Sequence, residues 1–171
     1  MDTNELRALQ APLKERYKAD PAKAMITMRA TGTLDDAAVA CRLDIDRATA
    51  RAGLHPAAGG SGAELCSGDM LLEALVGCAG VTLKAVATAM GIKIDHATVT
   101  AEGECDFRGT LGVDKTAPVG FQTIRLVFDI KSDAPKEQVD QLIKLAERYC
   151  VVYQTLLHPP VVTVSAQTGG A

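Results

Sequence analysis

The chain has 171 residues, of which 47% are hydrophobic and 23% charged, and 18 basic against 21 acidic side chains give a net charge of −3. This length and composition are typical of one globular domain. The chain has no basic block and only 4% aromatic residues, which argues against a nucleic-acid partner.

The N-terminal segment, residues 1–20, is polar and of mixed charge, without the apolar core of a secretory signal. Leu6, Leu9 and Leu13 fall on one stripe and predict a helix over residues 3–18. We interpret residues 1–20 as a helical extension that precedes a domain over residues 21–171, and we expect the protein to be cytoplasmic.

Residues 23–46 show the rough alternation of half-buried strands and predict a β-hairpin with its turn at TLDDA, residues 33–37. Residues 51–69 are rich in Gly, Ala and Pro and predict a long loop, a kind of segment that is often functional. The loop ends at Ser67 and Asp69, which are residue types that cap helices well.

Residues 70–90 form the longest apolar run, which Glu73 and Lys84 interrupt. A membrane-spanning helix needs about 20 mostly apolar residues, so we expect a helix buried in the protein and no membrane partner. Its polar positions make one narrow stripe through Glu73, Gly77, Gly80 and Lys84, and hydrophobic residues cover nearly all of the remaining surface.

The C-terminal half predicts two strands, at residues 92–106 and 121–132, with a loop between them. A helix follows over residues 132–150, in which Leu142, Ala146 and Cys150 share one face, so Cys150 should point to the core. A short helical turn at 151–160 and a last strand at 161–167 complete the chain. This order of elements predicts an α+β fold with helices packed on antiparallel sheets.

The five cysteines are odd in number and form no CxxC or CxH pair, which argues against a disulfide framework and a zinc site. Cys78 sits beside two glycines that leave space around its sulfur, and Cys150 is aimed at the same core. The pair is either two inert core residues or two thiols that can form a reversible disulfide. The other three are interpreted as structural: Cys41 in a strand, Cys66 in the loop, and Cys105 at a strand end near the surface.

Two motifs resemble the family of the OsmC and Ohr proteins, which are osmotically induced and organic-hydroperoxide-resistance proteins. SGDMLLEALVGCAGVTL, residues 67–83, is similar to the family's Leu/Ala-rich helix with its first cysteine, and LAERYCVVYQTL, residues 145–156, to its second cysteine at a helix end. The resemblance implies an OsmC-like fold, in which antiparallel sheets pack around a buried central helix in an intertwined homodimer with active sites at the subunit interface.

The resemblance also implies a thiol-dependent peroxidase that needs neither metal nor flavin. The Cys78 thiolate would attack the O–O bond of an organic hydroperoxide and become a sulfenic acid. Cys150 would resolve the sulfenic acid as a disulfide, and a dithiol reductant, such as a lipoyl-bearing protein, would reduce that disulfide.

The chain departs from this pattern at the residues that activate the thiolate. Gly68 stands where the hydroperoxide-resistance branch has a glutamate, and the turn over residues 31–38 has no arginine. Asp69 is a candidate for the missing carboxylate or a helix cap, and His55 is an alternative proton acceptor. Without the activating pair, we expect a near-normal Cys78 pKa of about 8.5.

Four arginines could replace the missing one: Arg29, Arg42, Arg47 and Arg51. Val151 also stands where the family often has a proline after its second cysteine. These departures leave two alternatives open. One is a non-catalytic OsmC-like protein that binds a small apolar ligand at the dimer interface, and the other is an interaction protein whose helix over residues 3–18 docks a partner.

Overall fold

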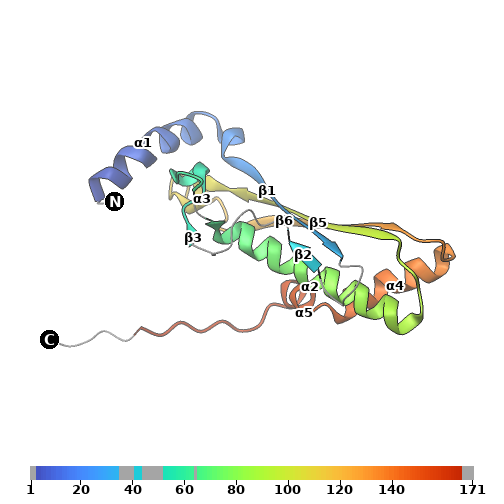
Figure 1. Cartoon of the computed structure of the whole chain (residues 1–171). Helices are drawn as coiled ribbons and strands as arrows, with labels where there is room; N and C mark the ends of the chain where they lie inside the picture. The colour runs from blue at the N-terminus through green and yellow to red at the C-terminus, as the bar shows by residue number, and fades with distance from the viewer. Residues whose placement is uncertain (1–2, 35–40, 44–51, 64, 167–171) are drawn as a thin grey trace.

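The structure is a computed structural model of the chain that describes residues 3–34, 41–43, 52–63 and 65–166 (Figure 1). Its main sheet has four antiparallel strands in the order β2-β1-β5-β6. These strands are β1 (Met25–Leu34), β2 (Cys41–Leu43), β5 (His96–Asp106) and β6 (Phe121–Lys131). The predicted hairpin is confirmed by the pairing of β1 with β2, while its predicted turn falls partly outside the described residues.

The long helix α2 (Ser67–Met90) lies along one face of this sheet, and α4 (Lys136–Tyr149) and α5 (Val151–Leu157) lie on the same side (Figure 1). Along β5 every second side chain is buried, and the inward ones are small, such as Ala97, Val99 and Ala101. Small side chains let the helix backbone come close to the sheet. The α+β prediction is therefore confirmed.

Helix α2 buries one side in this chain and exposes the opposite side. Leu72, Leu75 and Val76 are at most 1% exposed, whereas Leu71 is 39% and Val81 38% exposed. The single chain thus covers one side of the predicted buried helix, and the burial of the other side, which the resemblance assigns to a homodimer, stays a prediction. By length and composition α2 could cross a membrane, but its contacts with the sheet are those of a core helix in a globular protein, which passes the same test.

The N-terminal helix α1 (Thr3–Ala19) is confirmed and extends beyond one end of the sheet (Figure 1). Tyr17 is fully buried, and its hydroxyl donates a hydrogen bond of 2.8 Å to the carbonyl of Ala57. Gln10 donates to the next carbonyl, that of Ala58, at 3.3 Å. The extension is thus fastened to the short 3-10 helix η2 (Pro56–Ala58); another short helix, η1 (Pro21–Ala24), leads from α1 into β1.

The segment predicted as a loop over 51–69 contains η2 and two very short parallel strands, β3 (Ala52–Gly53) and β4 (Leu65–Cys66). Helix α2 begins at Ser67 with Cys66 as its N-cap residue and no side-chain cap hydrogen bond, so the prediction of a cap from Asp69 is wrong. The loop between β5 and β6 likewise contains a short helix, α3 (Phe107–Thr110).

The predicted last strand at 161–167 is wrong for the described residues up to 166. They extend away from the body without strand pairing, and Val161 is 93% exposed (Figure 1). Alternating valines favour an extended backbone, but a strand also requires a neighbour to pair with, and none of the described strands pairs with the tail.

Candidate active site

Cys78 and Cys150 are brought together by three helices. Cys78 lies midway along α2, and Cys150 is the residue between α4 and α5, where it ends one helix and begins the next. The backbone of Cys150 is extended (φ −73°, ψ 107°), which breaks the helical path and turns α5 back against α2. As predicted, Cys150 points to the core, where it is 1% exposed.

The Cys78 sulfur is an acceptor for several groups around it. They are the backbone N–H groups of Val151 and Val152 and the thiol of Cys150, and the hydroxyl of Thr82 lies within reach while it donates to the Cys78 carbonyl at 2.7 Å. The two backbone donors belong to the first turn of α5, whose N–H groups have no partner inside their own helix. The sulfur of Cys78 therefore supplies an acceptor for donors that α5 would otherwise leave unpaired.

These hydrogen bonds change the acidity of the Cys78 thiol. Burial raises its pKa, but the hydrogen bonds, of which that from Val152 is the strongest, outweigh burial and bring the pKa below its ordinary value. The expected value of about 8.5 stays a prediction, and the structure gives the direction of the shift, which is downward. Among the described residues, the groups that lower this pKa are backbone and side-chain hydrogen-bond donors.

Cys150 has the opposite character. Burial, together with its hydrogen bond to Cys78, raises the pKa of the Cys150 thiol to about 11. Its own sulfur accepts a hydrogen bond from the N–H of Tyr153 at 3.4 Å. Of the two thiols, Cys78 is therefore the one that loses its proton first, and Cys150 is the one that keeps its proton and donates it.

The predicted acid–base candidates lie elsewhere, at the start of α2. Asp69 interacts with His55 and Glu73, and burial raises the pKa of both carboxyl groups. His55 accepts a hydrogen bond from the N–H of Ala57 through Nδ1, at 3.0 Å, and its ring packs against Phe107 with centroids 5.0 Å apart. Neither Asp69 nor His55 is among the described groups that bind the Cys78 sulfur.

The four candidate arginines lie, wholly or by their side chains, outside the described residues. Arg47 and Arg51 lie outside the described residues, as do the side chains of Arg29 and Arg42. Within the part of the chain that the structure describes, no group of three or more His, Cys, Asp and Glu side chains could hold a metal ion.

The remaining cysteines differ from the sequence interpretation in one respect. Cys105 is 6% exposed and belongs to the main core, so its predicted place near the surface is wrong. Burial raises the pKa of its thiol. Cys66 is half-buried at the start of α2, and Cys41 lies in β2 as predicted. Cys66, Cys78, Cys105 and Cys150 are all free thiols.

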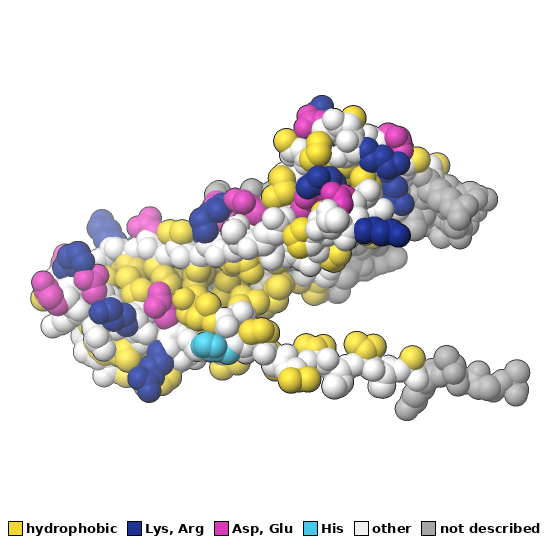
Figure 2. Space-filling model, turned by 180° about the vertical axis from the view of Figure 1, so that it is seen from behind, with side chains coloured by type: hydrophobic (Ala, Val, Ile, Leu, Met, Phe, Trp, Pro, Cys, Tyr) yellow, Lys and Arg dark blue, Asp and Glu magenta, His cyan; other side chains and the backbone are white. Residues whose placement is uncertain are grey.

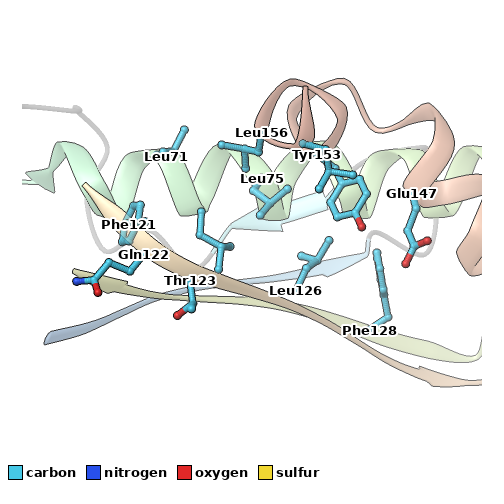
Figure 3. Close-up of a pocket in the computed structure, with 12 residues that line it drawn as sticks. Leu71, Leu75, Phe121, Gln122, Thr123, Leu126, Phe128, Glu147, Tyr153 and Leu156 are labelled. Carbon is cyan, nitrogen blue, oxygen red and sulfur yellow. The ribbon is translucent and has the colours of Figure 1, made fainter. Parts of the chain in front are cut away.

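A pocket of about 550 Å³ opens beside the paired thiols, between α2, β6 and the helices α4 and α5 (Figure 3). Figure 2 shows hydrophobic side chains gathered in the hollow between the edge of the sheet and the helices below it. Leu75 on its wall precedes Cys78 by almost one turn of α2, and Tyr153 on its wall donates to the Cys150 sulfur. The lining residues are Leu71, Leu75, Phe121, Gln122, Thr123, Ile124, Leu126, Phe128, Glu147, Tyr153, Leu156 and Leu157.

The sequence interpretation missed Thr82 and the N–H groups of Val151 and Val152. Thr82 carried a readable signal, because a residue four positions after Cys78 lies on the same helix face. The backbone donors carried none, since every non-proline residue has an N–H group and only the break at Cys150 turns these two toward the sulfur.

Comparison with known proteins places both motifs in one family model. The model described as OsmC-like protein matches residues 59–165, which include Cys78 and Cys150 and leave out α1, β1 and β2. A similar solved structure is the 1.70 Å crystal structure of an OsmC-like hydroperoxide resistance protein from Jannaschia sp. CCS1. It has a TM-score of 0.62 at 15% identity and covers 86% of this chain and 97% of its own. No curated protein matches the chain.

Proposed function

The chain belongs to the OsmC-like protein family, and from this premise we propose that it is a thiol peroxidase that reduces organic hydroperoxides in oxidative stress defence. The observation that carries the proposal is the pairing of a Cys78 thiol of lowered pKa with a protonated Cys150 thiol of raised pKa. A cysteine peroxidase needs one sulfur as a thiolate and a second within reach to resolve the product.

The first step takes place at Cys78. Its thiolate attacks the terminal oxygen of the hydroperoxide, an S–O bond forms, the O–O bond breaks, and the peroxide is reduced to an alkoxide that takes up a proton and leaves as an alcohol. Cys78 is oxidised to a sulfenic acid. The N–H groups of α5 around the sulfur hold the thiolate in place before the attack.

The second step joins the two cysteines. The Cys150 sulfur attacks the Cys78 sulfur, the S–O bond breaks, and the hydroxide leaves as water with the proton of Cys150. A dithiol reductant, such as a lipoyl-bearing protein, then reduces the disulfide by two thiol–disulfide exchanges. Such a cycle requires a supply of reduced dithiol, which the cytoplasm provides.

The apolar wall beside the thiols supports an organic rather than an inorganic peroxide as substrate. The pocket volume of about 550 Å³ lies in the range of small-molecule sites, and leucine and phenylalanine side chains dominate its lining. The alkyl or aryl part of the hydroperoxide would lie in the pocket, with its peroxide group directed past Leu75 and Tyr153 toward Cys78.

The exposed side of α2 supports a homodimer. Leu71, Ala74, Val81 and Ala85 are exposed and follow one another with Cys78 at steps of three and four residues, so they form one apolar stripe. A second copy of the chain over this stripe would complete the burial of the central helix and exclude water from the reactive sulfur.

The second candidate function is binding of a small apolar ligand without turnover. The observation that favours it is the pocket itself, whose described lining contains neither Cys78 nor Cys150. Retention of an apolar molecule through purification, with no consumption of peroxide, would support this alternative.

The test is intact-mass analysis with thiol counting, before and after one equivalent of cumene hydroperoxide. We expect the parent protein to lose two thiols and the Cys150→Ser variant to accumulate a sulfenic acid at Cys78, trapped by dimedone. Cys66→Ser removes a half-buried thiol at another place and should leave peroxide consumption unchanged. Unaltered thiols in the parent protein, or full consumption of peroxide by Cys78→Ser with a dithiol donor, would refute the peroxidase.

A further inference from the structure

The two ends of the pocket differ in their polar groups. In the close-up, Phe121 and Gln122 lie at one end, and Glu147, Phe128 and Tyr153 lie toward the other (Figure 3). Among the described residues that line the pocket, Glu147 is the one acidic residue, and none is a lysine, an arginine or a histidine. The lining of this otherwise apolar pocket therefore carries one negative charge, that of Glu147, which lies at one end of the pocket.

The carboxylate of Glu147 has no cationic partner among the described contacts. Its side chain extends from α4 toward Phe128 on β6, while its backbone carbonyl accepts a hydrogen bond from the side chain of Gln154 at 2.9 Å (Figure 3). The neighbouring cation, Arg148, lies over the ring of Tyr149, with its guanidinium carbon 5.7 Å from the centroid. A partly buried carboxylate without a counter-ion favours a ligand that brings one.

Two aromatic rings stand beside this carboxylate. Phe128 comes from the sheet and Tyr153 from α5, and both rings line the pocket near Glu147 (Figure 3). An aromatic face attracts a cation through its quadrupole, most strongly where water is excluded, and this is how proteins recognise quaternary ammonium groups. A carboxylate and two rings at one end of an apolar pocket together make a place for an alkylammonium group.

We propose that the pocket binds a single-chain amphiphile with a cationic head, an alkylammonium compound. Its head lies between Glu147, Phe128 and Tyr153, and its tail runs along Leu75, Leu126 and Leu156. An anionic head would meet the Glu147 carboxylate at one end and only neutral groups at the other. An uncharged head would leave that carboxylate without a partner.

This inference names the ligand class of the pocket and goes beyond the proposed reaction, although it rests on the same pocket as the proposed substrate site. Binding is measured without peroxide, so its outcome is separate from that of the peroxidase assay. The Cys78→Ser variant should bind the amphiphile as the parent protein does, whether or not the parent consumes peroxide.

The experiment is isothermal titration of the full chain with three ten-carbon probes, each below its micelle concentration: decyltrimethylammonium, decanol and decanoate. We expect the ammonium probe to bind about tenfold more tightly than decanol, a difference of about 1.4 kcal/mol, because the cation–π contact and the ion pair both favour the charged head. Decanoate should bind most weakly. This ranking is obtained on the unmodified protein and does not depend on any variant folding.

Glu147→Gln tests the assignment of the charge. It should lower the affinity for the ammonium probe severalfold, since the ion pair is lost while the cation–π contacts with Phe128 and Tyr153 remain, and it should leave decanol binding unchanged. Glu137→Gln is the matched control, because Glu137 lies exposed in the first turn of the same helix, outside the described pocket lining. Equal affinity for the ammonium and decanoate probes, an unchanged preference in Glu147→Gln, or binding of none of the probes because a second copy of the chain fills the pocket would overturn the inference.

Discussion

The thiol of Cys150 donates a hydrogen bond to the sulfur of Cys78, and this contact makes two chemically identical side chains unequal. The donating thiol holds its proton more tightly, while the accepting sulfur gives up its proton more easily. Both sulfurs also accept from N–H groups of α5, so the division of roles between an attacking and a resolving sulfur follows from which of the two thiols donates to the other.

Selective alkylation should reveal the difference in pKa between the Cys78 and Cys150 thiols. The pKa of Cys78 is lowered and that of Cys150 is raised to about 11, so iodoacetamide should modify Cys78 first at pH 7. As pH falls, the rate at Cys78 should begin to drop at a lower pH than that of N-acetylcysteine, because its thiolate persists further into acid. Peptide mass spectrometry from pH 5 to pH 9 measures both sites, and identical profiles for Cys78 and the free thiol would contradict the lowered pKa.

Cys150→Ala should raise the pKa of Cys78, because it removes one hydrogen-bond donor from the thiolate. We expect the alkylation rate at Cys78 at neutral pH to fall about fivefold, the effect of one hydrogen bond of about 1 kcal/mol. Cys150→Ser keeps an O–H donor and should recover much of the rate. Absorbance of the thiolate near 240 nm, followed through a pH titration, checks the assignment, and equal curves for the two variants would exclude a role for the donor.

Thr82→Val should also lower the reactivity of Cys78. The Thr82 hydroxyl reaches the carbonyl oxygen of Cys78 at 2.7 Å and is within hydrogen-bond reach of its sulfur, whereas valine has nearly the same shape and no donor. We expect a severalfold fall in the rate at neutral pH, in line with one lost hydrogen bond, with recovery at high pH and in Thr82→Ser.

The helix supplies a matched control for that variant. Thr88 donates to the carbonyl of Lys84 at 2.8 Å, in the same i to i−4 geometry as Thr82 but ten residues from Cys78 along α2. Thr88→Val should cost similar helix stability without changing the thiol titration. A shift of equal size in both variants would show a general effect on the helix.

Gly103→Ala should disturb the pocket from the sheet side. A β-carbon on Gly103 would lie 2.5 Å from the ring of Phe121, which lines the pocket, so the ring would have to move. Overpacking of this kind costs about 1–3 kcal/mol. Urea unfolding should show that loss in the free energy of unfolding together with weaker binding of decanol, and unchanged binding would mean that Phe121 does not shape the site.

Tyr17→Phe should loosen the N-terminal helix. The variant leaves the carbonyl of Ala57 without the 2.8 Å hydrogen bond from the Tyr17 hydroxyl in a fully buried place, at a cost of about 1–3 kcal/mol in the free energy of unfolding. Hydrogen exchange of α1 should rise more than that of α4, because α1 depends on this contact. Equal protection in both proteins would show that α1 is held by other contacts.

Hydrophobic periodicity correctly predicted the helices and strands whose apolar face is the face that packs against the core. The steps of three and four residues through Leu142, Ala146 and Cys150 identified both the helix α4 and the direction of Cys150. Alternation identified β6, in which Ile124, Leu126 and Phe128 face inward. In each case the local pattern and the tertiary environment select the same structure.

The site could be predicted only in part, because its chemistry depends on groups that have no side-chain signature. The two cysteines were visible as residues, but the donors that lower the pKa of Cys78 are backbone N–H groups oriented by the break at Cys150. The buried position of Cys105 was missed for a similar reason, since it depends on β1 and β6 lying on either side of β5. Strand pairing over long sequence distances has no local signal.

The conformation of the C-terminal tail affects the resistance of the protein to proteolysis. Residues 158–166 are extended, and the side chains of Val161, Val162 and Val164 are almost fully exposed. Proteases bind their substrates as extended strands, so this tail is presented in a conformation that is ready for cleavage. The rate at which a protease cleaves within residues 158–166 therefore reports whether another chain covers the tail. Fast cleavage indicates a tail without a partner. Slow cleavage indicates a tail that pairs with a strand of a neighbouring chain.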